Sequence, residues 1–328
     1  MDEPPAEPQA YAETGRFVAS GGLRLAVFEH CPDVPAGGDA DRGGAAAPVM
    51  LFVHGYPDSH GVWDGLLAAL GPATHAARYD VRGAGESEAP RHLRGYRLEQ
   101  LADDLFAVAD SVSPDRPVHV VAHDWGSIQA WQAATDPRAA ARIASFTTIS
   151  GPCLDHTAYW CRERLRHPTP RRVAQLLRQG AKSWYVLAFH VPFAAPLLWR
   201  RRLANAWPGL LRRTEGIEPG PAHPQPTLAR DAVRGIGLYR ANMIPRLLRP
   251  EFRFARIPVL IISPTLDRFV DPALAEGLEH WVPDLRREQL ACGHWAAITR
   301  EAPELAGLIR AFVADVEADR AERAGGKP

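Results

Sequence analysis

Residues 118–126 read Val-His-Val-Val-Ala-His-Asp-Trp-Gly, and this stretch decides the fold. The apolar run Val118–Ala122 is typical of a fully buried parallel strand, and a helical pattern follows from Gly126. Ala122, Asp124 and Gly126 have the spacing of the sharp strand-to-helix turn known as a nucleophile elbow. Small residues on either side let strand and helix approach closely, so we expect the turn to lift Asp124 above the sheet edge.

Strand-like and helix-like segments alternate on both sides of this turn, which predicts an α/β fold with a mostly parallel central sheet. The expected strands are Arg16–Ser20, Leu23–His30, Val49–Val53, Thr74–Tyr79, Val118–Ala122, Ile143–Ile149, Ile257–Ile262 and Arg286–Leu290. The expected core helices are Trp63–Leu70, Leu98–Ser111, Gly126–Thr135, Pro272–Trp281 and Pro303–Ala318.

The alternation stops after the sixth strand and resumes near Ile257. Helix-like segments broken by Pro and Gly fill the interval, which predicts a helical cap inserted into the core. We therefore expect a flexible tail at 1–14, a core at 15–152 and 257–320, a cap at 153–256 and a second tail at 321–328. A Gly/Ala/Asp/Pro-rich stretch, Pro32–Pro48, is expected to be a long surface loop.

Composition excludes several classes of protein. The 328 residues carry 38 basic and 38 acidic side chains, and this balance argues against nucleic-acid binding. No signal peptide is predicted, and the longest apolar run, Ser183–Trp199, is short for a membrane span and interrupted by His and Pro. We predict a cytoplasmic enzyme without metal or cofactor, with four reduced cysteines that show no metal-binding spacing: Cys31, Cys153, Cys161 and Cys292.

Aspartate at the elbow points to a particular chemistry. A serine there suits acyl transfer, whereas a carboxylate is a competent nucleophile at sp³ carbon and forms an alkyl ester with the enzyme, which water then cleaves. Asp124 is therefore the predicted nucleophile. The alternative is that Asp124 only caps the following helix.

Two further residues fit the same chemistry. His294 lies in a loop after the last predicted strand, where this chain order places the base that activates water. Asp267, in the loop after strand Ile257–Ile262, is expected to orient His294 and stabilise its charged form. Asp271 is a rival acid, but its place just before Pro272 is more typical of a helix N-cap.

The segment His54-Gly55-Tyr56-Pro57 follows the strand Val49–Val53. The backbone N–H groups of Tyr56 and Trp125 are predicted to form an oxyanion hole for hydrolysis of the ester. The alternative is an ordinary strand-to-helix turn. We interpret His54 as structural, and His123 as too far toward the strand side to be the base.

The chain from Arg16 to Ala318 resembles epoxide hydrolases of the α/β-hydrolase fold. The resemblance rests on His-Gly-x-Pro at 54–57, His-Asp-Trp-Gly at 123–126 and Gly-His-Trp at 293–295. Tyr-Asp-Val-Arg-Gly-Ala-Gly-Glu-Ser at 79–87 and Leu-Tyr-Arg-Ala-Asn-Met at 238–243 are most similar to the EphD-type subgroup. Members of that subgroup often carry a C-terminal short-chain dehydrogenase domain, which we expect to be absent here.

The resemblance implies two cap tyrosines that hydrogen-bond the epoxide oxygen and donate a proton as the ring opens. Tyr239 matches one of them, and Tyr185 matches the other, although His190 replaces a common glutamine after it. The alternative for each tyrosine is that its side chain only packs within a helix of the lid. Substrate contacts are expected from Trp125, Pro57, Phe189, Met243 and Trp295.

The predicted product is a vicinal diol from a small hydrophobic or lipid-like epoxide. A haloalkane dehalogenase is the main alternative, because it shares the aspartate elbow and the histidine–acid pair; Tyr56, where asparagine is usual in such enzymes, disfavours it. Trp125 disfavours a fluoroacetate-type dehalogenase, and Asp124 disfavours an ordinary esterase. A non-catalytic ligand-binding protein of the same fold is a further alternative.

The zero net charge hides an uneven distribution. Residues 153–256 contain 19 basic and six acidic side chains, a formal charge of +13, so the remainder carries −13. One interpretation is that the cap and the core attract each other. The other is that a basic, partly apolar cap, including Arg200-Arg201-Arg202 after the apolar run to Trp199, makes weak contact with an anionic membrane surface or draws in lipid-like anionic epoxides.

Overall fold

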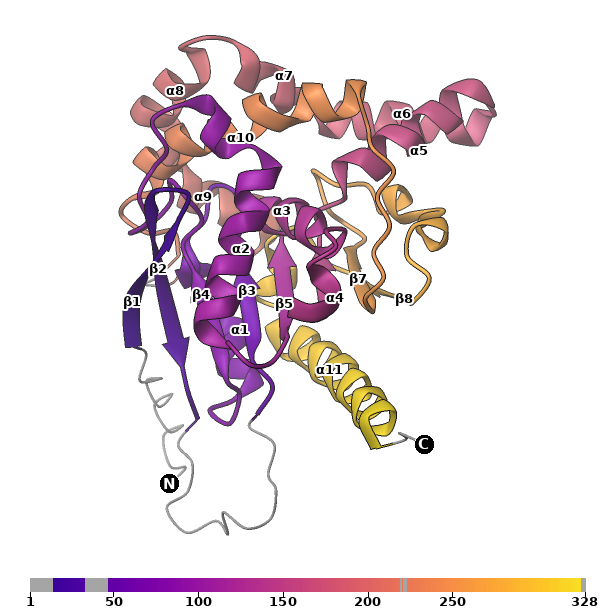
Figure 1. Ribbon diagram of the computed structural model, residues 1–328. Coiled ribbons are helices and arrows are strands. Elements are labelled where there is room, and N and C mark those ends of the chain that lie inside the picture. Colours follow the sequence, from indigo (N-terminus) through magenta and orange to yellow (C-terminus); the bar gives the residue numbers. More distant parts are fainter. Residues whose placement is uncertain (1–13, 33–46, 219, 221–222, 326–328) are drawn as a thin grey trace, which may run out of the picture.

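The computed structural model describes residues 14–32, 47–218, 220 and 223–325. Within these residues eight strands form one sheet in the order β1-β2-β4-β3-β5-β6-β7-β8 (Figure 1). β2 is antiparallel to β1 and β4, and the other neighbours are parallel, so the sheet is mostly parallel as predicted. The strands are β1 Thr14–Ser20, β2 Leu23–His30, β3 Met50–Val53, β4 Ala76–Tyr79, β5 Val118–His123, β6 Ile143–Ile149, β7 Val259–Pro264 and β8 Leu285–Leu290.

The central strands are buried along their whole length because helices cover both faces of the sheet. Every residue of β3, β4, β5 and β6 is buried. Among the core helices, α1 packs on α11 and α2 packs on α3. The core helices are α1 Asp64–Leu70, α2 Leu98–Val112, α3 Trp125–Ala134, α4 Ala139–Arg142 and α11 Ala302–Gly325, with short turns η1 His60–Trp63, η2 Leu93–Tyr96 and η6 Ala296–Ile298.

Helices fill the interval between β6 and β7, where the cap is predicted. They lie together beyond the end of the sheet toward which β5 points (Figure 1). The long helix α10 is their centre, since it packs on α5, α7, α8 and η3. The elements are α5 Leu154–Arg166, α6 Pro170–Lys182, α7 Trp184–His190, α8 Ala194–Leu198, the π-helical turn η3 Trp199–Leu203, α9 Ala204–Glu215 and α10 Leu228–Leu248.

The structure differs clearly from the sequence prediction at two places. The helix expected at Pro272–Trp281 is two 3₁₀ turns, η4 Pro272–Ala275 and η5 Leu278–His280, because Gly277 at φ 80° breaks the helical path between them. Helix α11 continues to Gly325, through most of the predicted tail 321–328, in a stretch rich in good helix formers. The predicted loop Pro32–Pro48 and the N-terminal tail fall largely outside the described residues.

None of the helices in the described ranges is both long enough and apolar enough to cross a membrane.

Candidate active site

The turn between β5 and α3 carries Asp124 in a strained conformation. Its φ of 52° and ψ of −123° lie outside the regions that a non-glycine residue ordinarily adopts. Strand and helix are in close contact here, since a Cβ on Gly126 would lie 2.0 Å from the carbonyl oxygen of Val53. Only glycine fits that position, and the tight turn presents the Asp124 side chain at the carboxyl end of the sheet.

Backbone amides surround the Asp124 carboxylate. The Tyr56 N–H donates to Asp124 Oδ1 over 2.8 Å. Gly55 permits this approach, because a Cβ on it would lie 2.5 Å from the same oxygen. The Trp125 N–H heads α3 and has no acceptor among the described residues, so it is available to a developing anion. The two N–H groups predicted to form an oxyanion hole therefore both lie next to the nucleophile.

His294 lies between two carboxylates. Its Nε2 is 3.5 Å from Asp124 Oδ2, and its Nδ1 is 2.8 Å from Asp267 Oδ2. The other oxygen of Asp267 accepts the N–H groups of Phe269 and Val270, at 2.7 and 3.0 Å. Asp267 is thus fixed from behind and presents one oxygen to the imidazole, the arrangement that orients a general base.

The charges of this trio are mutually dependent. Burial alone would lower the pKa of His294, but the charge of Asp267 and hydrogen bonds to both carboxylates raise it well above its usual value. Burial alone would raise the pKa of Asp267, but the neighbouring imidazolium and the backbone N–H donors lower it. The two carboxylates therefore favour the charged form of His294. Loss of the negative charge on Asp124 would lower the pKa of His294 and make it a base.

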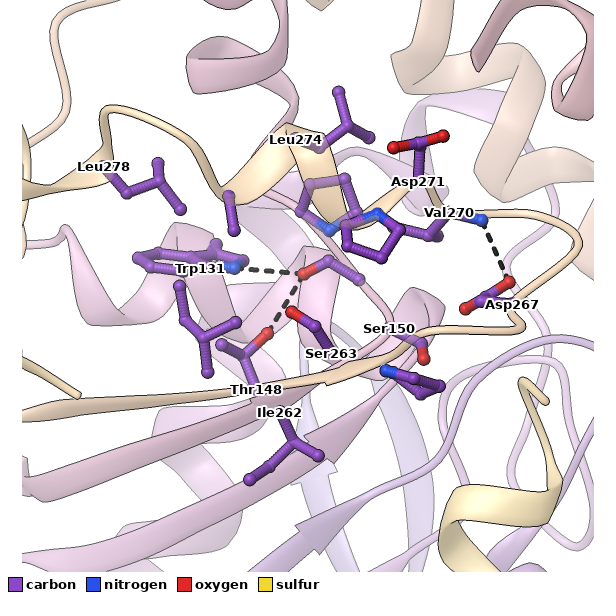
Figure 2. A pocket seen from close by; sticks show the side chains of 16 residues that line it. Trp131, Thr148, Ser150, Ile262, Ser263, Asp267, Val270, Asp271, Leu274 and Leu278 are labelled. Atoms are coloured by element: carbon purple, nitrogen blue, oxygen red, sulfur yellow. Dashed lines mark hydrogen bonds between the residues drawn. The ribbon is translucent and has the colours of Figure 1, made fainter. Parts of the chain in front are cut away.

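Asp271, the alternative candidate for the acid, has different partners. Asp271 Oδ1 accepts the N–H of Ala273 at the start of η4, and Asp271 Oδ2 pairs with Arg178 and Lys182. Figure 2 shows Asp267 and Asp271 at separate positions on one loop, with the hydrogen bond from Val270 to Asp267. The structure brings Asp267, and not Asp271, to His294.

The two predicted tyrosines come from different cap helices and meet above the nucleophile. Their ring centroids are 5.9 Å apart, and the Tyr239 ring packs edge-on against Trp125 at 4.8 Å. Burial and the nearby Asp124 charge raise the pKa of Tyr185, while a hydrogen bond with Tyr239 opposes the rise. Burial, followed by Tyr185 and Asp124, raises the pKa of Tyr239 well above its usual value. Both phenols therefore keep their protons and can donate hydrogen bonds.

Two cavities of about 370 Å³ each extend from this point under the cap. The α6 cavity runs between α5, α6 and α10, and the α9 cavity runs between α7, α8, η3 and α9. Both are in the size range of small-molecule sites and have largely apolar walls. Neither lining contains Arg or Lys among the described residues. The residues common to both linings are Asp124, Trp184, Tyr185, Tyr239 and Phe269.

The sequence of the chain also matches a known protein family. A family model described as "alpha/beta hydrolase fold" matches residues 48–301. The chain belongs to the α/β-hydrolase fold family. The predicted fold class is confirmed.

Relatives of this α/β-hydrolase bear out the predicted resemblance to epoxide hydrolases. It is 35% identical over 284 residues to the "Probable oxidoreductase EphD" of Mycobacterium tuberculosis, covering 85% of this chain and 46% of that protein. The chain therefore spans about half the length of that relative. It is 27% identical over 316 residues to "Epoxide hydrolase A" of the same species, covering 94% of this chain and 86% of that protein. A product complex of a variant epoxide hydrolase from Bacillus megaterium has a similar fold, with TM-score 0.69, 20% identity and coverage of 91% of this chain and 100% of that one.

All five predicted substrate contacts of this α/β-hydrolase line one of the two cavities. Trp125 and Met243 line the α6 cavity, whereas Pro57, Phe189 and Trp295 line the α9 cavity.

Several residues that shape the site were not predicted. Phe269 lines both cavities and packs edge-on against His294 at 5.1 Å; its place two residues after Asp267 is the one sequence signal that points to it. Glu215, at the end of α9, accepts the Trp295 N–H over 3.1 Å, and the Trp295 indole donates to Asp58 over 2.9 Å. Both contacts hold the segment that carries His294, and the contact from Glu215 depends on how the cap sits on the core.

The remaining histidines near the site are structural. Val81 N–H donates to His54 Nε2 at 2.9 Å, and His54 Nδ1 is 2.9 Å from the Gly55 carbonyl oxygen, so His54 joins two loops. His123 Nε2 is 3.1 Å from the carbonyl oxygen of His294. Burial and the charge of His294 lower the pKa of His123 well below its usual value, which keeps it neutral.

A cluster of metal-ligand residue types lies away from this site, although the four cysteines show no metal-binding spacing in the sequence. Glu29, Cys31 and His75 bring their ligand atoms within 4.8 Å of one another. Arg16 and His75 already pair with Glu29, each at a distance of 3.0 Å or less. The cluster was not predictable because Cys31 and His75 belong to distant parts of the chain.

Proposed function

We propose that this α/β-hydrolase opens an epoxide to a vicinal diol through an alkyl ester on Asp124. One observation carries the proposal: the carboxylate at the elbow and two phenols, Tyr185 and Tyr239, line both cavities, and His294, beside that carboxylate, lines the α9 cavity. A carboxylate nucleophile needs an sp³ carbon, and two phenolic donors suit a leaving oxygen that stays attached to the substrate. The names of the relatives support the same activity.

In the first step an oxygen of Asp124 attacks an oxirane carbon. The carbon–oxygen bond on the far side of that carbon breaks, and the electron pair goes to the ring oxygen. Tyr185 and Tyr239 donate hydrogen bonds to this alkoxide, and one of the two phenols transfers its proton to it as the ring opens. The His294 imidazolium, whose pKa falls as the Asp124 charge is lost, returns a proton to that phenolate and becomes neutral. The enzyme is now an ester of the substrate, and Asp124 has lost its negative charge.

In the second step His294 acts as a base, because its pKa falls when the Asp124 charge disappears. It takes a proton from water, which attacks the carbonyl carbon of the ester, while Asp267 stabilises the imidazolium. The tetrahedral oxyanion accepts hydrogen bonds from the backbone N–H groups of Tyr56 and Trp125. Collapse of this intermediate releases the diol with an oxygen from Asp124, and the carboxylate retains an oxygen from water.

The cavities suggest the substrate class. The nucleophile lies where the α6 and α9 cavities meet, so an oxirane with an apolar substituent on each side would place one substituent in each cavity. Their linings contain no Arg or Lys among the described residues and are largely apolar, so we propose a neutral, hydrophobic reacting end.

Halide release is a poorer fit. The Tyr56 hydroxyl donates to the carbonyl oxygen of Ala232 over 3.0 Å. The side chain at the position where haloalkane dehalogenases usually carry asparagine therefore already has a partner within the described residues.

A single turnover in ¹⁸O-water, with enzyme in excess over an aromatic epoxide, tests the mechanism. The proposal predicts a diol free of ¹⁸O and an Asp124-containing peptide that gains the label. A labelled diol with an unlabelled peptide would mean direct attack by water. Halide release from haloalkanes, with no diol from any epoxide, would favour the dehalogenase alternative.

A further inference from the structure

The cap exposes apolar side chains on α7 and α8. These form the cap rim, in which each side chain is between 47% and 84% exposed: Trp184, Leu187, Val191, Phe193, Leu197 and Leu198. Trp184 and Leu187 lie three residues apart, on one side of α7, and Val191 follows directly after its last residue. A contiguous apolar surface of this kind on a soluble fold marks an interaction site.

The tip of the cap rim is held in a strained conformation. Phe193, which is 84% exposed, has a φ of 62° in the left-handed region, which is costly for a bulky residue. Arg240 of α10 fixes the turn before it, since its guanidinium donates to the carbonyl oxygens of Phe189 and Val191 at 2.7 and 3.1 Å. The chain thus holds an aromatic ring in water at a fixed position, where it gains no packing.

The cap rim is also the edge of both substrate cavities. Trp184 lines both cavities, Leu187 lines the α6 cavity, and Val191 and Leu198 line the α9 cavity. A hydrophobic molecule that leaves an apolar phase at the rim can therefore reach Asp124 along apolar walls.

Unpaired positive charge adjoins the cap rim. Arg200, Arg201 and Arg202 follow α8 directly, are exposed, and form no ion pair with any described residue. On α6, by contrast, basic residues pair with the core: Arg171 pairs with Glu276, and Lys182 with Asp271. Attraction between cap and core therefore explains the basic residues of α6 but not those after α8.

We propose that the cap rim and Arg200–Arg202 dock on an anionic lipid bilayer, with Phe193 and Leu197 in the interface and the guanidinium groups at the phosphates. Interfacial helices combine an apolar face with basic residues in this way. The cavities then open toward the bilayer, so an epoxide dissolved in the lipid enters without crossing water. This last step rests on the proposed function, whereas docking itself requires no catalysis.

Co-sedimentation with vesicles tests docking without any substrate. The full chain should bind phosphatidylglycerol-rich vesicles at low salt, bind phosphatidylcholine vesicles far less, and lose affinity for the former at high salt. Replacing Arg200, Arg201 and Arg202 by glutamine should lower the partition coefficient about a hundredfold, since each such charge contributes about a fivefold factor near an anionic surface. Phe193→Ser with Leu197→Ser should weaken binding to the same vesicles.

Matched variants elsewhere on the cap serve as controls. Arg166, Arg249 and Arg256 are also exposed arginines without an ion pair among the described residues, and their replacement by glutamine removes the same charge. Leu165 and Leu248, each 69% exposed, are the apolar controls for replacement by serine. Both control variants should bind like the wild type.

Three results would overturn the proposal. The first is equal binding to neutral and anionic vesicles. The second is a loss of binding in the control variants equal to that in the rim variants. The third is no vesicle binding together with a rim-dependent dimer in sedimentation velocity, because the cap rim would then be a contact between two copies of the chain. If the protein hydrolyses epoxides, the arginine variant should also keep kcat/KM on a small soluble epoxide and lose activity on an epoxide embedded in anionic vesicles.

Discussion

Replacing Asp267 by asparagine should block the second chemical step and spare the first. One oxygen of Asp267 accepts the N–H groups of Phe269 and Val270 at 2.7 and 3.0 Å. The amide oxygen of asparagine must take this place, because an NH₂ group there would face two donors and leave both unsatisfied, at about 1–3 kcal/mol each. The NH₂ group then faces His294 Nδ1, at the position where the carboxylate oxygen is 2.8 Å away.

This orientation forces the wrong tautomer on His294. Nδ1 must accept a hydrogen bond, so the remaining proton of the neutral ring moves to Nε2, which faces the Asp124 ester and the attacking water. Nε2 then donates where it should accept. The same exchange in a Ser-His-Asp triad lowers kcat about 10⁴-fold, which corresponds to about 5 kcal/mol in the activation free energy. We expect a loss of about 10³–10⁴-fold in ester hydrolysis.

Rapid-quench kinetics separates the two steps. The Asp267→Asn variant should show a burst of epoxide consumption near one equivalent per enzyme, followed by slow diol release, because Asp124 is unchanged. The matched control is Asp271→Asn, which keeps the cap to Ala273 and loses only ion pairs near the surface, so its kcat should change by less than about threefold. A kcat for Asp267→Asn within tenfold of the wild type, or no burst, would refute this reasoning.

The other predictions concern proton donation, packing and pH. Tyr239→Phe and Tyr185→Phe should each slow enzyme alkylation about 10²-fold in stopped-flow measurements, and more together, since each removes one donor to the alkoxide; an unchanged rate in the double variant would exclude their role. Gly126→Ala should lower the free energy of unfolding in urea by about 3 kcal/mol, whereas Gly209→Ala, with open space around it, should raise it by about 0.5–1 kcal/mol. The pKa of His294 is raised in the free protein and should fall once Asp124 is esterified. On acidification, kcat should therefore decline at a lower pH than the pH at which NMR shows His294 of the free protein to titrate. Equal values for the kinetic and the NMR midpoints would contradict this prediction.

The elbow could be predicted because its determinants are local. A buried strand, an exposed nucleophile and a glycine at close spacing define the turn, and the strain at Asp124 and the contact of Gly126 with Val53 follow from that spacing. The choice of Asp267 over Asp271 was also local, since a residue before Pro272 is suited to capping. The loops that carry these residues meet because the carboxyl ends of parallel strands lie at one edge.

The arrangement of the cap could not be predicted in this way. Phe269, Glu215 and Trp184 shape or line the site only because helices far apart in sequence pack over the sheet. The prediction of a helix at Pro272–Trp281 was wrong, because the hydrophobic periodicity of this segment does not reveal the break at Gly277. The residue counts likewise predicted the sign of the net charge of the cap, but they could not show which arginines form ion pairs.

Intact-protein mass spectrometry of a His294→Gln variant tests the central claim most directly. Glutamine at this position cannot act as the base, so the ester formed on Asp124 should persist. After incubation with short aromatic, terpenoid and long-chain epoxides, we expect a mass increase equal to that of the epoxide accepted, on the peptide containing Asp124, and none when Asp124 is also replaced by alanine. An unchanged mass with every epoxide, or an adduct on any other residue, would contradict the mechanism.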